Sequence, residues 1–106
     1  MSEMATLQRT VASFVEEAGI EASVHMRLLD LVSEVGELSK EVLTATNYGR
    51  DSFHPPDGWA GELGDAFFVL ACLANDTGVD LEAALDGALG KYRERLLLGG
   101  DAGSGG

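Results

Sequence analysis

Two short acidic segments, each set inside an apolar helical pattern, constrain the fold of this chain more than any other feature. Glu34 and Glu37 are three residues apart, and Glu62 and Asp65 repeat this spacing further along. Residues three apart in a helix lie on one face, about one turn from each other. Apolar residues accompany both pairs at spacings of three and four. The sequence therefore predicts two amphipathic helices with carboxylates at the edges of their apolar faces.

The four carboxylates have two interpretations. If they converge, their like charges repel, and a cation between them is needed to hold them together. Carboxylate oxygens favour a hard divalent metal such as Mg²⁺ or Mn²⁺. If they do not converge, the pairs are solvated helix faces in a chain with 18 acidic residues. The repeated spacing favours convergence, as do the neighbouring Gly36 and Gly64, which would permit close helix approach.

The remaining periodicity predicts an all-α protein with four helices. The expected helices cover residues 1–19, 24–45, 59–76 and 81–97. Ser23 and Asp80 are expected N-caps, and Gly19 is an expected helix stop. No segment alternates between apolar and polar residues as a strand does. Gly87 and Gly90 weaken the last helix unless another helix approaches closely there.

One domain is expected over residues 1–98, with the glycine-rich residues 99–106 as a disordered tail. Residues 47–58 contain two glycines and two prolines and are predicted to form a loop. A loop of this length is often functional, and an exposed connection without a role is the alternative.

The formal net charge of −11 argues against general affinity for nucleic acid or for an anionic membrane surface. It leaves room for a small anionic ligand bound through a metal. The acidity fits either adaptation to high salt or ordinary solubility. No apolar run is long enough to span a bilayer. The single cysteine, Cys72, cannot form an internal disulfide, so we expect a cytoplasmic protein with Cys72 packed in its core.

The acidic segments in their context resemble the signature helices of the MazG-like nucleoside triphosphate pyrophosphohydrolases. The similar stretches are LVSEVGEL at 31–38, ELGDAFFVL at 62–70 and LANDTGVDLEAAL at 73–85, within about residues 24–95. The resemblance implies a four-helix, bundle-like MazG fold that forms oligomers. It also implies Mg²⁺-dependent hydrolysis of a nucleoside triphosphate, a dNTP or a non-canonical NTP, to the monophosphate and pyrophosphate. Such a reaction would clear unwanted nucleotides from the pool.

The resemblance assigns roles to particular residues. The implied catalytic residues are also the implied metal ligands: Glu34, Glu37, Glu62 and Asp65. Lys91 matches a family lysine that would neutralise substrate phosphate, and Arg93 and Arg95 could share this role. For Arg95 the alternative is stabilisation of a helix C-terminus through the helix dipole.

Two positions depart from the family pattern. Many members have a glutamate immediately before the first ligand, where this chain has Ser33, a poor base. The water is then activated by metal, by a ligand carboxylate or by another acid such as Glu41. Tyr92 stands where many relatives have asparagine. Trp59, one turn before Glu62, is the best-placed side chain to stack on a nucleobase, with a core or interface role as the alternative.

Other functions fit the same pattern. Phosphoribosyl-ATP pyrophosphohydrolase of histidine biosynthesis uses the same arrangement of carboxylates on a different substrate. A non-catalytic helical module for binding or oligomerisation is another alternative, and the departures at Ser33 and Tyr92 are the features that favour it. The wide apolar arc of the second helix favours a homodimer or homotetramer, in which a neighbouring subunit would help close the nucleotide pocket.

Overall fold

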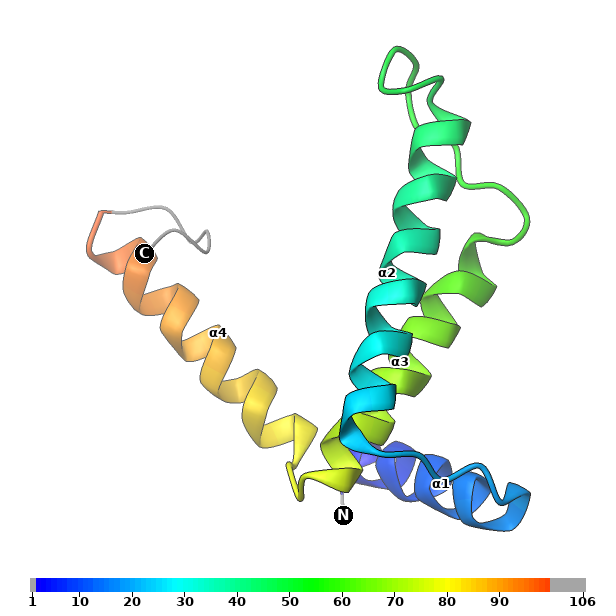
Figure 1. Ribbon diagram of the computed structural model, residues 1–106. Coiled ribbons are helices and arrows are strands. Elements are labelled where there is room, and N and C mark those ends of the chain that lie inside the picture. The colour runs from blue at the N-terminus through cyan, green and yellow to red at the C-terminus, as the bar shows by residue number, and fades with distance from the viewer. Residues whose placement is uncertain (1, 100–106) are drawn as a thin grey trace.

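The computed structural model describes residues 2–99, which form four α-helices and no strand. The helices are α1 (Glu3–Ala18), α2 (Val24–Ala45), α3 (Trp59–Asp76) and α4 (Leu81–Leu97) (Figure 1). The all-α prediction is confirmed, and each predicted helix agrees with the observed one within two residues at either end. The predicted tail, apart from Gly99, lies outside the described residues.

Local chemistry explains the helix boundaries. Ser2 and Ser23 cap α1 and α2, because each hydroxyl accepts a hydrogen bond from the backbone N–H three residues later, at 3.0 and 3.2 Å. Gly19 ends α1 with φ +67°, a left-handed conformation that glycine adopts without a steric cost. After α2, the buried Thr46 hydroxyl donates to the Val42 carbonyl at 2.7 Å and accepts from the Gly49 N–H at 2.9 Å. This arrangement turns the chain into the loop that leads to α3.

The α2–α3 pair is the most extensively packed part of the fold. The two helices run antiparallel and side by side, joined at one end by the loop over residues 46–58 (Figure 1). All the buried apolar side chains of the described region belong to α3: Val69, Ala71, Cys72 and Ala74. Burial raises the pKa of the Cys72 thiol, so this residue is a packing residue, as predicted from its apolar surroundings.

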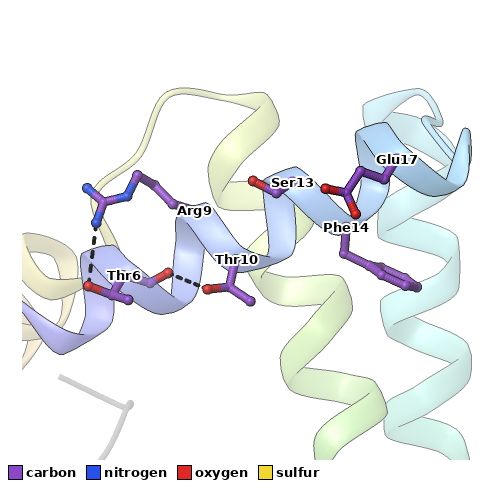
Figure 2. A pocket seen from close by; sticks show the side chains of 6 residues that line it. All are labelled: Thr6, Arg9, Thr10, Ser13, Phe14 and Glu17. Atoms are coloured by element: carbon purple, nitrogen blue, oxygen red, sulfur yellow. Dashed lines mark hydrogen bonds between the residues drawn. The ribbon is translucent and has the colours of Figure 1, made fainter.

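Helix α1 crosses one end of the α2–α3 pair. Phe14 points from α1 toward this pair (Figure 2), and its ring meets Phe68 of α3 edge to face, with 6.1 Å between the centroids. The surface hollow shown in Figure 2 is lined by α1 alone and contains none of the predicted site residues.

Helix α4 has a different environment. It packs on α1 through its first turns, where Met4, Leu7 and Leu85 line one surface hollow, and then points away from α2 and α3 (Figure 1). Within the described residues, α4 has no buried side chain. None of the four helices combines the length and the apolar character that crossing a membrane requires.

Candidate metal centre

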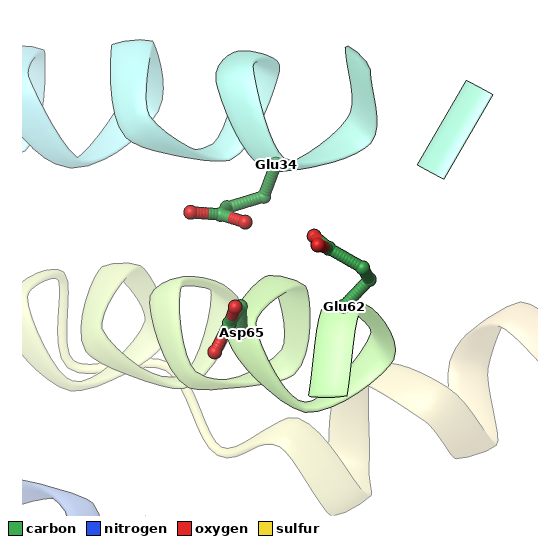
Figure 3. Close-up of side chains that lie close together, drawn as sticks. All are labelled: Glu34, Glu62 and Asp65. Carbon is green, nitrogen blue, oxygen red and sulfur yellow. The ribbon is translucent and has the colours of Figure 1, made fainter. Parts of the chain in front are cut away.

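The antiparallel pairing of α2 and α3 brings the two acidic segments together. Glu34 projects from α2 toward α3, and Glu62 and Asp65 project from α3 on the facing side (Figure 3). One carboxylate oxygen from each of the three lies within 4.8 Å of the others. Glu34 and Glu62 are half-buried, and Asp65 is exposed. The three acids therefore form a cluster, which we call the acidic cluster, that opens to solvent on one side.

The charges that shift the pKa of Glu62 are all negative. Partial burial raises the pKa of Glu62, and the neighbouring charges raise it further, in the order Glu37, Asp65, Glu34 and Glu41. Glu37 is outside the group of three oxygens within 4.8 Å, yet its charge acts on Glu62 more strongly than any other. No basic side chain is among the groups that shift this pKa. The electrostatic environment thus favours a bound cation or a proton.

The donor set fits a hard divalent metal. Opposite oxygens of an octahedral Mg²⁺ site are about 4.2 Å apart, since each lies about 2.1 Å from the ion. Small side-chain rotations therefore suffice to bring oxygens now within 4.8 Å into contact with one ion. Mg²⁺ also retains several waters and binds substrate phosphates, which suits a three-carboxylate cluster that is open on one side.

The prediction that Gly36 and Gly64 permit a close approach of the two acidic helices is wrong for a single chain. A Cβ added at Gly36 or Gly64 would meet no atom within 4 Å, so neither glycine is needed for the approach of α2 and α3. The same holds for Gly87 and Gly90 in α4, which no neighbouring helix crowds. The acids converge because the helices pair antiparallel in this register, and the reach of the glutamate side chains spans the remaining gap.

Comparison with known proteins agrees with this geometry. The MazG nucleotide pyrophosphohydrolase domain matches residues 23–96, which include the whole acidic cluster. This chain belongs to the MazG nucleotide pyrophosphohydrolase family. A crystal structure of the Bacillus-conserved MazG protein, a nucleotide pyrophosphohydrolase, is similar, with a TM-score of 0.71 and 29% identity. The similarity covers 87% of this chain and 90% of that one.

A curated relative adds a partial match. The uncharacterized protein YpjD of Bacillus subtilis (strain 168) is 37% identical over 68 residues, which are 61% of this chain. The matched region spans 60% of the length of YpjD.

The predicted base-binding residue of this MazG domain lies near the cluster. Trp59 is half-buried at the start of α3, one turn before Glu62. Its ring meets Phe53 of the 46–58 loop edge to face, with 5.0 Å between the centroids. The loop therefore packs against the helix end that carries Glu62, and Trp59 links the two.

The predicted phosphate-binding residues are on the helix that points away. Lys91, Arg93 and Arg95 lie on α4, which packs on α1 and leaves the α2–α3 pair (Figure 1). The Lys91 ammonium and the Arg95 guanidinium lie 5.4 and 5.8 Å from the centre of the Tyr92 ring, at cation–π distances. A single chain therefore does not bring this basic segment to the acidic cluster.

Besides Thr46, two buried polar side chains were not predicted from the sequence. Gln8 and Arg27 are 8% and 6% exposed. Arg27 donates to the Ile20 carbonyl at 2.7 Å and so ties the α1–α2 connection to α2. Both lie in line with the apolar residues of their helices, since Gln8 precedes Val11 by three residues and Arg27 precedes Leu31 by four. A polar residue at such a position is the signal that could have found them.

Proposed function

We propose that this protein hydrolyses a nucleoside triphosphate to the monophosphate and pyrophosphate in a Mg²⁺-dependent reaction, on a dNTP or a non-canonical NTP. The acidic cluster carries this proposal, because three carboxylates from two helices meet at an open site within the segment that matches the MazG domain. The expected role is removal of unwanted nucleotides in the cytoplasm. The similar crystal structure, of a nucleotide pyrophosphohydrolase, supports the choice of substrate class.

The carboxylates would act by holding the cation that makes phosphate binding favourable. Glu34, Glu62 and Asp65 are the proposed ligands, and Glu37 is the fourth, because its charge acts on the same site. A divalent cation held there would supply charge neutralisation at the phosphoryl oxygens and a more acidic water. Without it, the negative charge of a triphosphate would be repelled by the acidic cluster, in a chain with a formal charge of −11.

The proton of the attacking water needs an acceptor. Ser33 is exposed and its hydroxyl is a poor base, so it does not replace the glutamate that many family members have there. Glu41 is half-buried, one turn beyond Glu37 on α2, and its charge acts on Glu62. We therefore assign proton acceptance to Glu41, the acid near the cluster that is outside the proposed ligand set.

We also propose that the active form is a homodimer or homotetramer. Large apolar side chains remain exposed on α2, where Leu29 and Val32 are each 63% exposed, and on α4, where Leu85 is 51% exposed. Covering these faces with another copy would bury apolar area that one chain leaves in water. A neighbouring subunit could then bring Lys91 and Arg93 to the acidic cluster.

A nucleotide panel with pyrophosphate detection tests the proposal. It should contain dNTPs, non-canonical NTPs and phosphoribosyl-ATP, each with and without Mg²⁺, at low and high salt. We expect Mg²⁺-dependent pyrophosphate release from at least one nucleoside triphosphate, and its loss in Glu34→Gln. Asp30→Asn is the matched control, since Asp30 is an exposed acid one turn earlier on α2. Full activity of Glu34→Gln, or turnover of phosphoribosyl-ATP alone, would contradict the assignment.

A further inference from the structure

A pair of amide side chains connects three helices at one point. Gln8 of α1 is 8% exposed, and its Nε2 donates to Asn75 Oδ1 at 3.1 Å and to the Val79 carbonyl at 2.9 Å. Its Oε1 accepts from the Leu81 N–H at 2.8 Å. Asn75 in turn donates from Nδ2 to the backbone carbonyl of Gln8 at 2.9 Å. We call Gln8 and Asn75, with these four hydrogen bonds, the amide clamp.

The amide clamp completes the N-terminus of α4. The first N–H groups of a helix have no partner within it, and a buried donor without one is costly. Asp80 accepts from the Glu82 and Ala83 N–H groups at 2.9 and 3.2 Å. Gln8 accepts from Leu81, the remaining donor of the first turn. The cap of α4 is therefore shared between its own Asp80 and a side chain from α1.

The clamp lies where the direction of α4 is set. Beyond its first turns, α4 does not pack on the α2–α3 pair, and the preceding turn contains Gly78 at φ +70°. A helix of 17 residues is about 25 Å long, so a tilt of about 10° at its start moves its end by about 4 Å. A small change at the clamp is thus magnified at the basic segment.

We propose that Gln8 and Asn75 are positioning residues, which fix the direction of α4 and thereby the position of Lys91. The inference about the direction of α4 rests on these hydrogen bonds and not on the proposed function, whereas the role of Lys91 rests on the proposed function. Each part has its own readout. The first is a distance between helices, and the second is a kinetic coupling.

Spin-label distances test the direction of α4. In a Cys72→Ala background, Ser39→Cys on α2 and Glu94→Cys on α4 place labels at exposed positions. Labelled chains are diluted into unlabelled full-length chains, so that each assembly carries one labelled pair. We expect one narrow distance in the unsubstituted background. In Gln8→Met, which keeps the side-chain length but removes the three hydrogen bonds of the Gln8 side chain, we expect a broad distance distribution instead. A pair at Glu16→Cys and Ser39→Cys should remain narrow in the same variant.

Two further variants distinguish a change in the direction of α4 from a general loss of stability. Asn75→Asp keeps an acceptor for Gln8 Nε2 but places a carboxylate oxygen where the donor to the Gln8 carbonyl was. We therefore expect a broadened distance in this variant too, which keeps the proposal testable if Gln8→Met does not fold. Phe14→Leu removes the edge-to-face contact with Phe68 and weakens the packing of α1 without touching the clamp. It should leave the α2–α4 distance narrow. An unchanged α2–α4 distance in a folded clamp variant, or equal broadening in Phe14→Leu, would overturn the proposal.

Kinetics test the link to Lys91. If the clamp acts through Lys91, Gln8→Met raises the KM for the nucleotide, and adding it to Lys91→Ala raises the KM no further. If the KM of the double variant instead rises by the product of the two single-variant factors, the link to Lys91 is refuted. The conclusion from the spin-label distance is not affected. Absence of pyrophosphate release from the unsubstituted protein would refute the proposed function instead, again without affecting the distance measurement.

Discussion

Helices α3 and α4 are nearly equal in length, at 18 and 17 residues, yet the fold uses them in opposite ways. Helix α3 holds all the buried apolar residues of the described region and two acids of the acidic cluster. Helix α4 holds no buried residue and is anchored near its N-terminus. Packing along its length fixes α3, whereas a few contacts and hydrogen bonds at one end fix α4.

This difference matches the demands of the proposed chemistry. Metal ligands must be held within tenths of an ångström, which requires a rigid support such as the α2–α3 pair. Phosphate-binding lysines and arginines have long, flexible side chains and tolerate a less rigid one. The comparison predicts that substitutions on α3 act on chemistry and folding, and that substitutions on α4 act on substrate binding and assembly.

The largest effect is expected for Asp65→Asn on α3. Loss of one proposed metal ligand should lower the rate of pyrophosphate release by about a hundredfold or more, because stabilisation of the transition state by a bound metal is worth several kcal/mol. Asp86→Asn, an exposed acid on α4, is the control and should retain the rate. Pyrophosphate detection under saturating Mg²⁺ measures both, and equal losses would remove the distinction between the helices.

The next effect concerns stability. Val69→Ala on α3 should lower the free energy of unfolding by about 2 kcal/mol, because two buried methyl groups are lost from a residue that is 6% exposed. Leu89→Ala on α4 removes a side chain that is 37% exposed within one chain. Its effect should be smaller in dilute protein and should grow with protein concentration if a neighbouring subunit covers α4.

Denaturant titrations at several protein concentrations measure this pair. If Leu89→Ala lowers the free energy of unfolding by the same amount at every protein concentration, α4 is not part of a subunit interface.

A smaller effect is expected for Lys91→Ala. Loss of a charge-assisted contact to phosphate should raise the KM about tenfold, corresponding to about 1.4 kcal/mol, with little change in kcat. The other lysine of the chain, Lys40, is exposed on α2, and Lys40→Ala provides the control. Initial rates over a range of nucleotide concentrations separate the two parameters. An unchanged KM would exclude Lys91 from substrate binding.

The smallest effect concerns the acidic cluster without metal. Because the pKa of Glu62 is raised in the folded protein, the folded state holds this proton more tightly than the unfolded state. Stability from this group is therefore present at low pH and is lost as the pH rises from the ordinary carboxyl range through the raised pKa. Glu62→Gln should raise the melting temperature of the metal-free protein at neutral pH and change it little under acidic conditions.

Thermal unfolding in the presence of a chelator, and again with Mg²⁺, measures this effect. Mg²⁺ should stabilise the unsubstituted protein more than Glu62→Gln. If Glu62→Gln is less stable than the unsubstituted protein in chelator at neutral pH, the carboxylates of the acidic cluster do not destabilise the metal-free fold by repulsion.

The amino-acid sequence determined the four helices, because each boundary depends on neighbouring residues. Ser23 caps α2 by accepting a hydrogen bond from the N–H of Met26, three residues later. Gly19 ends α1 because its backbone adopts a left-handed conformation. The spacing and apolar flanks of Glu34, Glu37, Glu62 and Asp65 also predicted that these acids converge. The structure brings Glu34, Glu62 and Asp65 within 4.8 Å of one another and leaves Glu37 outside this group. Only the tertiary structure showed that Gly36 and Gly64 are not needed for this approach.

The tertiary structure alone decided how α4 is placed. The Gln8–Asn75 hydrogen bonds join residues that are 67 positions apart in the sequence. No local sequence pattern predicts which distant amide a buried glutamine will bind. The direction of α4, and with it the separation of Lys91 from the acidic cluster within one chain, depends on these contacts. Helix formation is a short-range property of the chain, whereas helix orientation depends on long-range pairing.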